Sequence, residues 1–175
     1  MKNVVLIGFM GVGKTSTGRL LAARLGKAFI DIDRKIETEC GASIAELFAE
    51  KGESFFRDRE REVISRVSRL RNAVIATGGG AVANEENMRK LRESGIIISL
   101  VASIATILER TGRRNSRPLL NRPDREEYTA RLYARRQGLY QTADLIIDTS
   151  EISPHQVVDI IVAFLRRRGY IHGRC

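Results

Sequence analysis

Residues 4–22 read VVLIGFMGVGKTSTGRLLA and combine an apolar run, a glycine-rich turn and a stretch with helical spacing. The apolar run, within Lys2 to Phe9, is typical of a strand buried on both faces of a parallel sheet. Leucines after the turn have the spacing of a buried helical face, which predicts a helix from Lys14 to Leu25. The turn at residues 8–15 fits the pattern GxxxxGK followed by Ser or Thr. A strand, this turn and a helix in that order predict a phosphate-binding loop, or P-loop.

A loop of this kind binds phosphate groups mainly through its backbone. Glycines let the chain wrap tightly, so that N–H groups and the start of the following helix face an anion. Lys14 would neutralise charge on the β- and γ-phosphates, and the Thr15 hydroxyl would offer an oxygen to Mg²⁺. The alternative is a glycine-rich turn with a solvated lysine, and the strand and helix around it argue against that. The residues that we assign to ATP in this loop are Gly11, Val12, Gly13, Lys14, Thr15 and Ser16.

The rest of the chain continues the alternation of short apolar strands and helices. Further strands are predicted at 28–32, 73–77, 96–101 and 145–148. Helices are predicted at 85–93, 103–110, 124–142 and 154–167, and the segment 34–70 is expected to be helical in pieces. Gly41 and Gly52 should break that segment, and Ser43 with Glu46 should form a capping box. This pattern predicts an α/β fold whose parallel sheet is covered on both faces and binds ligands at the carboxyl ends of its strands.

Length and composition predict a single globular domain spanning residues 1–175. Hydrophobic residues make up 43% of the chain and charged residues 29%, which excludes a disordered polypeptide. The two cysteines, Cys40 and Cys175, lie far apart without metal-ligand spacing, so a reducing cytoplasm is the expected location. Glycines and Lys14 interrupt the first apolar run, and no other run is long enough for a bilayer. We therefore expect no targeting segment and no membrane partner.

The formal net charge of +9 suggests either a polyanionic partner or a small anionic substrate held by arginines. Nine arginines lie between residues 110 and 136, and the run Arg166–Arg168 ends the last predicted helix. We find no stacking aromatics or motif typical of nucleic-acid binding, so no nucleic-acid partner is expected. A nucleotide-dependent nucleic-acid-binding module remains the alternative from another functional class.

Acidic and basic side chains follow the second predicted strand. Asp31 and Asp33 stand at its end, and we expect one to face Mg-ATP while the other meets a second substrate. The alternative for Asp33 is an N-cap of the next helix. Further along, Arg57 precedes Glu60 by three residues on one helix face, so the carboxylate can orient the guanidinium for bidentate binding of a substrate carboxylate. The alternative there is an ordinary solvated ion pair.

Three consecutive glycines, residues 78–80, follow the third predicted strand. They allow the backbone to approach a ligand closely and to donate N–H groups to an anion, with a flexible turn as the alternative. The long loop at 111–124 has two prolines and no hydrophobic period, which favours a lid. Arg117 within it could close over the phosphates and stabilise charge during transfer, and the alternative is a solvated loop arginine.

The last candidate is an arginine in the segment RRQGLYQTAD. Arg136 lies four residues before Tyr140 and could face the same cleft as Arg57. Its neighbour Arg135 competes for this position, and the spacing leaves open which of the two points inward.

Taken together and in order, these motifs resemble those of shikimate kinases. They are GFMGVGKTSTGRLLA, DID, FFR with a glutamate three residues on, GGGAV, SRPLL and RQGLY, between about Val4 and about Leu165. The resemblance implies a three-layer P-loop fold like that of nucleoside monophosphate kinases, with a five-stranded parallel sheet. It also implies a substrate-binding region at about 33–60 and a mobile lid at about 112–124.

The activity implied by this resemblance is ATP-dependent phosphorylation of the 3-hydroxyl of shikimate. The products would be shikimate 3-phosphate and ADP, within the biosynthesis of chorismate and aromatic amino acids. A related small-molecule kinase, such as one acting on gluconate, remains an alternative because its P-loop would look much the same. The GGG and FFR motifs favour shikimate. Shikimate and ATP would be the only partners of a monomeric enzyme, with Mg²⁺ as cofactor.

The resemblance also implies roles for particular residues. Asp31 would hold Mg²⁺ through water, beside Thr15, and Asp33 would bind the shikimate hydroxyls and accept the attacking proton. Lys14 and Arg117 would stabilise the transferred phosphoryl group. Arg110 and Pro154 look like the pair that flanks adenine. The implied shikimate-binding residues are Asp33, Phe48, Phe56, Arg57, Gly79, Gly80 and Arg136.

Overall fold

The computed structural model describes residues 2–112 and 124–171. Its centre is one five-stranded sheet with the order β2-β3-β1-β4-β5. All neighbouring strands pair in parallel, which confirms the predicted α/β class and the five-stranded parallel sheet. The strands are β1 (Asn3–Gly8), β2 (Ala28–Asp31), β3 (Ala73–Ala76), β4 (Gly95–Val101) and β5 (Leu145–Asp148).

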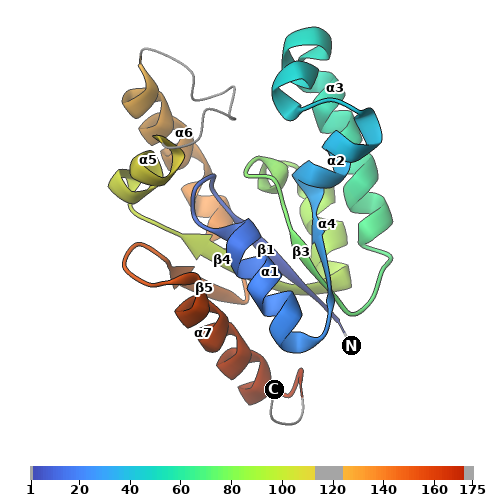
Figure 1. Cartoon of the computed structure of the whole chain (residues 1–175), viewed down its shortest axis with the longest axis vertical. Coiled ribbons are helices and arrows are strands. Elements are labelled where there is room, and N and C mark those ends of the chain that lie inside the picture. Colours follow the sequence, from blue (N-terminus) through green and yellow to red (C-terminus); the bar gives the residue numbers. More distant parts are fainter. Residues whose placement is uncertain (1, 113–123, 172–175) are drawn as a thin grey trace.

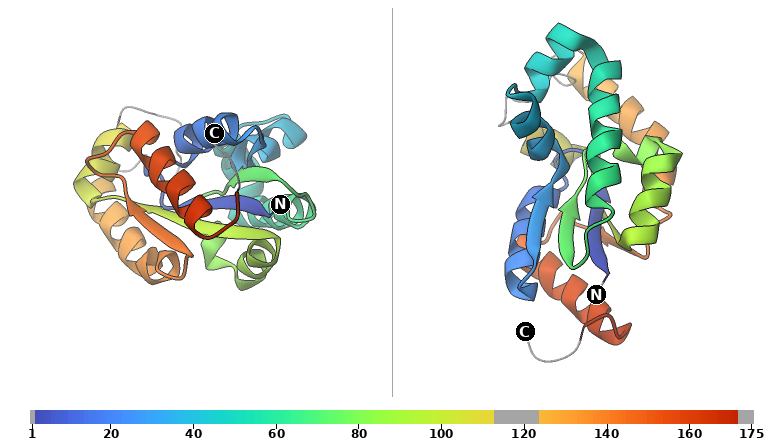
Figure 2. Two further views of the ribbon diagram at one scale, coloured as in Figure 1. Left: turned by 90° about the horizontal axis from the view of Figure 1, so that it is seen from below. Right: turned by 90° about the vertical axis from the view of Figure 1, so that its right-hand side faces the viewer.

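Helices cover both faces of this sheet. Figure 1 and Figure 2 show α1 and α7 on one face and α4 and α6 on the other, while α3 packs against α4. The helices are α1 (Lys14–Leu25), α2 (Ile32–Cys40), α3 (Ile44–Val67), α4 (Glu85–Ser94), α5 (Ile104–Gly112), α6 (Arg125–Tyr140) and α7 (Pro154–Arg167), with a short 3₁₀ helix, η1 (Ala81–Ala83). No helix in the described ranges is long and apolar enough to cross a membrane.

The central strand explains why the first apolar run has no polar alternation. All six residues of β1 are buried, and Val5 pairs with Ile75 of β3 and with Ile97 of β4. Because helices lie on both faces of the sheet, side chains of either parity meet apolar neighbours. The strand ends at Gly8, where the chain turns into the P-loop at the carboxyl edge of the sheet.

The region after β2 differs in one respect from the sequence-based expectation. The strand ends at Asp31, and α2 begins at Ile32, so Asp33 lies in the first helical turn. The prediction that both aspartates stand at the end of the second strand was therefore wrong for Asp33. The N-cap is Asp31, whose Oδ1 accepts the Arg34 N–H at 3.3 Å, and the alternative that gave this role to Asp33 was also wrong.

The helical segment after β2 is broken at the two glycines where the sequence predicted breaks. Gly41 ends α2 in a left-handed conformation, and Gly52 interrupts α3 with φ 78° and ψ 170°. The predicted capping box is present, since Ser43 and Glu46 satisfy each other's backbone N–H groups. These breaks let α2 and the first part of α3 extend beyond the sheet on one side of the P-loop (Figure 1).

Gly8 occupies a position that strongly disfavours any side chain. Its φ is 142°, and an added Cβ would lie 2.2 Å from the backbone oxygen of Leu100 in β4. We expect Gly8→Ala to lower the free energy of unfolding by about 3 kcal/mol, since it combines backbone strain with a clash against an immobile atom. Urea unfolding followed by circular dichroism measures this change.

Gly26 provides the matched control for that substitution. It ends α1 with φ 60°, and an added Cβ there meets no atom within 4 Å. Gly26→Ala should therefore show the left-handed backbone cost alone, about 1 kcal/mol. Equal losses in the two variants would contradict the steric explanation for Gly8.

Candidate active site

A cavity of about 840 Å³ lies at the carboxyl edge of the sheet, around the P-loop. Its lining comes from α2 and α3 on one side of the loop and from α5 and α6 on the other (Figure 1). The fold thus brings segments that are more than one hundred residues apart in sequence to one site, as expected for a parallel α/β sheet.

The P-loop is shaped to present backbone N–H groups. Gly11 and Gly13 have φ values of 81° and 95°, which favour glycine, and Gly13 caps α1 without a side-chain hydrogen bond. The start of a helix has N–H groups without partners inside the helix, which is why helix N-termini bind anions. The buried Lys14 Nζ donates to the carbonyls of Gly8 and Phe9 at 2.7 and 2.8 Å. This lysine is thereby held within its own loop.

Two oxygen-bearing side chains meet beside the loop. The Thr15 hydroxyl donates to Oδ2 of Asp31 at 2.7 Å, and both residues line the cavity. Within residues 2–112 and 124–171 there is no group of three His, Cys, Asp or Glu residues that could hold a metal. A hydroxyl and a carboxylate fit an ion that keeps most of its ligands as water and phosphate oxygens, as Mg²⁺ does. The donor set therefore suits the ion predicted from the sequence.

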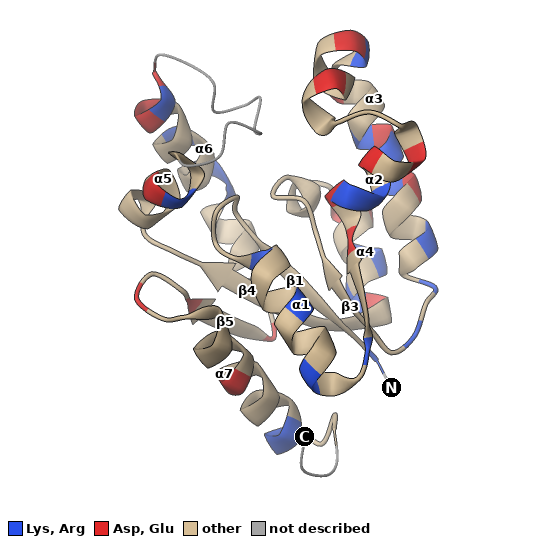
Figure 3. Cartoon of the chain, viewed as in Figure 1, with Lys and Arg blue, Asp and Glu red and all other residues tan. Residues whose placement is uncertain are grey.

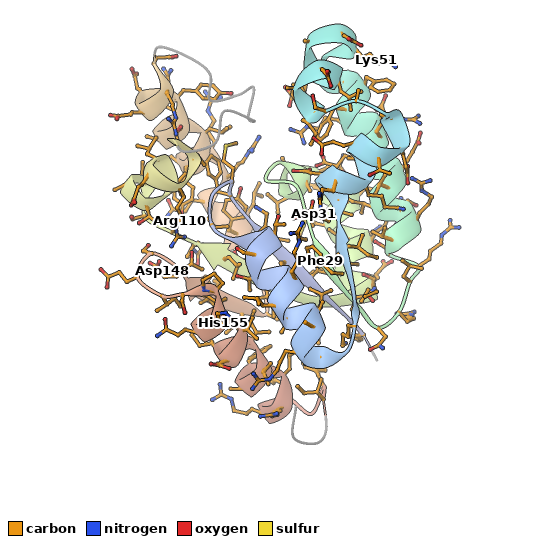
Figure 4. All side chains as sticks on the ribbon, viewed as in Figure 1. Phe29, Asp31, Lys51, Arg110, Asp148 and His155 are labelled. Atoms are coloured by element: carbon orange, nitrogen blue, oxygen red, sulfur yellow. The ribbon has the colours of Figure 1, made fainter. Side chains whose placement is uncertain are left out.

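The other side of the P-loop is held by Arg110 and Thr149. Arg110 donates to the Thr149 hydroxyl at 3.0 Å and to its carbonyl at 2.6 Å. The buried Thr149 hydroxyl also lies 3.0 Å from the carbonyl of Val12, so it joins the end of β5 to the P-loop. Figure 4 shows Asp31 and Arg110 on opposite sides of the start of α1. Sequence reasoning missed Thr149, since a single threonine after a strand carries no distinctive signal.

The predicted pair of Arg57 and Glu60 is present on α3, and its carboxylate is buried. Arg57 Nη1 donates to Glu60 Oε2 at 2.8 Å, and its Nη2 donates to Glu53 Oε1 at 3.0 Å. Only 1% of Glu60 is exposed, so the alternative of a solvated ion pair was wrong. Burial raises the pKa of the Glu60 carboxyl, the charge of Asp33 adds to this, and Arg57 opposes it. Glu60 and Glu53 together therefore hold the Arg57 guanidinium in place at the cavity wall.

The glycine turn is crowded by charged side chains of the protein itself. A Cβ on Gly78 would lie 2.6 Å from Asp33 Oδ1 and 2.9 Å from Glu60 Oε1. On Gly80 it would lie 2.6 Å from Arg57 Nη2. The sequence predicted that these glycines let a ligand approach closely. The structure adds a second reason, because a side chain at Gly78 or Gly80 would have to displace Asp33, Glu60 or Arg57.

The structure decides between the two neighbouring arginines of α6. Arg136 lines the cavity and donates to the Gly79 carbonyl at 3.3 Å, whereas Arg135 is exposed and does not line it. Tyr140, one turn later, donates its hydroxyl to the same carbonyl at 3.0 Å. The sequence left this choice open because Arg135 and Arg136 are consecutive residues, and the spacing does not show which of them faces the cavity.

One cavity contains every described residue that the sequence singled out for a ligand. These are Gly11, Val12, Gly13, Lys14, Thr15, Ser16, Asp31, Asp33, Phe48, Phe56, Arg57, Gly79, Gly80, Arg110, Arg136 and Pro154. The rings of Phe48 and Phe56, both on α3, lie 5.0 Å apart, centroid to centroid. Arg117 and residues 113–123 of the predicted lid lie outside the described residues.

Further lining residues had no predicted role. Glu37 lines the cavity and also accepts the Ile44 N–H at 3.1 Å, which ties the end of α2 to the start of α3. Arg34 and Glu109 line it as well. Figure 3 shows the basic end of α7 at the opposite end of the molecule from α2 and α5. That arginine run therefore lies away from the cavity.

The family model and the most similar relatives and solved structures are all shikimate kinases. The model of the shikimate kinase family matches residues 10–166. A shikimate kinase of Pelotomaculum thermopropionicum is 44% identical over 171 residues, which cover 98% of this chain and 99% of that protein. One from Thermodesulfovibrio yellowstonii is 46% identical over 162 residues, covering 93% and 94%. The structure of shikimate kinase from Acinetobacter baumannii in complex with shikimate matches with a TM-score of 0.93 at 35% identity, covering 96% of this chain and 94% of that one.

Proposed function

This chain belongs to the shikimate kinase family, and from that premise we propose how the residues of its cavity divide the work of transferring a phosphoryl group. It is an ATP-dependent kinase of the shikimate pathway with the P-loop fold of that family. The proposal rests on one observation above all. Arg57, Arg136 and Asp33 line the same cavity as Lys14 and Thr15, so a small carboxylate and a triphosphate can meet there.

The nucleotide occupies the P-loop side in this proposal. The N–H groups of residues 11–16 bind the β- and γ-phosphates, and Lys14 exchanges its two loop carbonyls for phosphate oxygens. Arg110 and Pro154 flank the adenine, with Arg110 held in place by Thr149. Arg117 of the lid, at about 112–124, supplies a further positive charge to the transferred group.

Thr15 and Asp31 are the residues that hold Mg²⁺, with Asp31 acting through water. The ion, when bound, neutralises charge on the phosphate oxygens. The hydrogen bond between these two side chains holds both of their oxygens at the cavity wall. Asp31 Oδ2 accepts the Thr15 hydroxyl, while its Oδ1 accepts the Arg34 N–H at the start of α2.

Shikimate occupies the side formed by α2, α3, α6 and the glycine turn. Its carboxylate pairs with the guanidinium groups of Arg57 and Arg136, because planar forks suit bidentate binding of a carboxylate. Phe48 and Phe56 contact the ring, and the backbone of Gly79 and Gly80 adds N–H donors. The substrate-binding region is thus residues 33–60 together with parts of α6 and the glycine turn, within a single kinase domain, residues 1–175, that acts as a monomer.

Asp33 takes the proton in the transfer step. The 3-hydroxyl oxygen of shikimate bonds to the γ-phosphorus, and the bond from that phosphorus to the β–γ bridging oxygen breaks to release ADP. The hydroxyl proton passes to the Asp33 carboxylate. Asp33 stands beside Gly78 and Glu60, at the junction of the two halves of the cavity. Alignment and charge neutralisation supply most of the acceleration in this class of reaction.

A coupled assay of ADP release tests the proposed acceptor. Shikimate, gluconate and nucleoside monophosphates are supplied side by side with Mg-ATP, and phosphorus NMR identifies the product. Of the three acceptors, we expect only shikimate to be turned over, and its product to be phosphorylated at the 3-oxygen. Preference for gluconate would favour the related small-molecule kinase, and specific nucleic-acid binding without stimulation by any small acid would favour the binding module.

A further inference from the structure

Two donors from one helix converge on a single carbonyl of the glycine turn. The Tyr140 hydroxyl lies 3.0 Å from the Gly79 oxygen, and Arg136 Nη1 lies 3.3 Å from it. The two donors are four residues apart and therefore share one face of α6. A carbonyl oxygen has two lone pairs, so the pair of donors fills its capacity.

The peptide that carries this carbonyl also carries the N–H of Gly80. The described chain has no cis peptide, so the carbonyl and this N–H point in opposite directions in one plane. Three consecutive glycines let such a plane rotate more freely than other residues would. An anchor on the carbonyl therefore sets the direction of the N–H. No backbone carbonyl in the described ranges accepts from the N–H of Gly79 or Gly80, and both residues line the cavity.

Tyr140 itself lies behind the cavity wall. It is fully buried and does not line the cavity. Burial raises the pKa of its hydroxyl, which therefore stays protonated and able to donate at physiological pH. Its ring lies 6.4 Å from that of Tyr133, which in turn meets Phe9 of the P-loop edge-on at 5.4 Å. This packing fixes the hydroxyl relative to the P-loop.

We propose that Tyr140 is a positioning residue, which fixes the Gly79–Gly80 peptide so that the Gly80 N–H is presented to the acceptor. The inference rests on the proposed function, which places the acceptor against the glycine turn. Hydrogen bonds to the carbonyl also polarise the peptide and strengthen its N–H as a donor. Tyr140 thus acts on acceptor binding through the turn, without touching the acceptor.

Tyr140→Phe tests this role, because it removes the hydroxyl and keeps the ring. With the full chain, ATP and shikimate, we expect the KM for shikimate to rise about 3- to 10-fold, the effect of one hydrogen bond. The KM for ATP should stay within about twofold. Tyr133→Phe removes a hydroxyl from the same aromatic cluster and should change neither constant. An unchanged KM for shikimate, or equal rises in both constants, would overturn the proposal.

A second measurement does not depend on the variant folding. In the wild-type protein with ¹⁵N-labelled glycine, saturating shikimate should shift the Gly80 amide signal far more than those of Gly26 and Gly169. Those two glycines lie just after α1 and α7, away from the cavity lining. An unmoved Gly80 signal would overturn the inference. If the wild-type protein turns over shikimate while that signal stays still, only this inference fails, whereas no turnover would contradict the proposed function itself.

Discussion

Asp33→Asn should lower kcat by about 10²- to 10⁴-fold, the usual contribution of a positioned proton acceptor. The substitution keeps the shape of the side chain, whose Oδ1 lies beside Gly78. The amide can still meet a hydroxyl but does not take its proton. Binding of ATP should be retained, because the P-loop and Asp31 are unchanged. Stopped assays of ADP release and calorimetric titration with a nucleotide analogue measure the two quantities.

Asp58→Asn is the matched control for that variant. Asp58 lies on α3 and pairs with Arg61, outside the cavity lining. Its replacement should leave kcat and both KM values close to wild type. If Asp33→Asn raised the KM for shikimate but kept kcat, Asp33 would bind the acceptor without receiving its proton.

Arg57→Ala should lower kcat/KM for shikimate by about 10³-fold, which corresponds to about 4 kcal/mol. The substitution removes the proposed carboxylate fork and also leaves the Glu60 carboxylate, 1% exposed, without its charged partner. ATP affinity should change little. Arg57→Lys keeps the charge but not the planar fork, so it should recover only part of the loss. Steady-state kinetics with shikimate varied at saturating ATP measure this effect.

The double variant Arg57→Ala/Glu60→Ala separates recognition from the cost of an unpaired buried charge. It removes both charges together, so the free energy of unfolding should recover relative to Arg57→Ala alone. The low kcat/KM should persist if Arg57 recognises the substrate. Arg61→Ala, on an exposed part of the same helix, should match the wild type. Recovery of activity in the double variant would remove Arg57 from substrate recognition.

Most of the fold follows from signals that act locally in the chain. The P-loop glycines, the apolar run of β1 and the capping box at Ser43 each specify nearby geometry, and each is found where it was predicted. The helices α1 and α7 also begin and end at the predicted residues. The parallel sheet follows from the alternation of strands and helices, because parallel strands need crossovers.

The candidate site is less predictable because it depends on side chains that meet only in three dimensions. Asp31 and Asp33 are two residues apart in either a strand or a helix, and the boundary between β2 and α2 decides where each points. Thr149 is recognisable as a link to the P-loop only once β5 lies beside β4. The sequence does not distinguish a buried glutamate from a solvated one, and tertiary packing is what buries Glu60.

The aromatic contacts beneath the glycine turn have a practical consequence for studying this enzyme. The chain contains four tyrosines and no tryptophan, so its near-ultraviolet fluorescence comes from tyrosine. Tyr133 and Tyr140 lie between Phe9 and the turn, whereas Tyr170 is 37% exposed. Because Tyr140 donates to the glycine turn, against which we place the acceptor, we expect acceptor binding to alter the surroundings of this pair more than those of Tyr170. The tyrosine fluorescence of the unmodified protein should therefore report acceptor binding, and a titration with shikimate that leaves the emission unchanged would contradict this expectation.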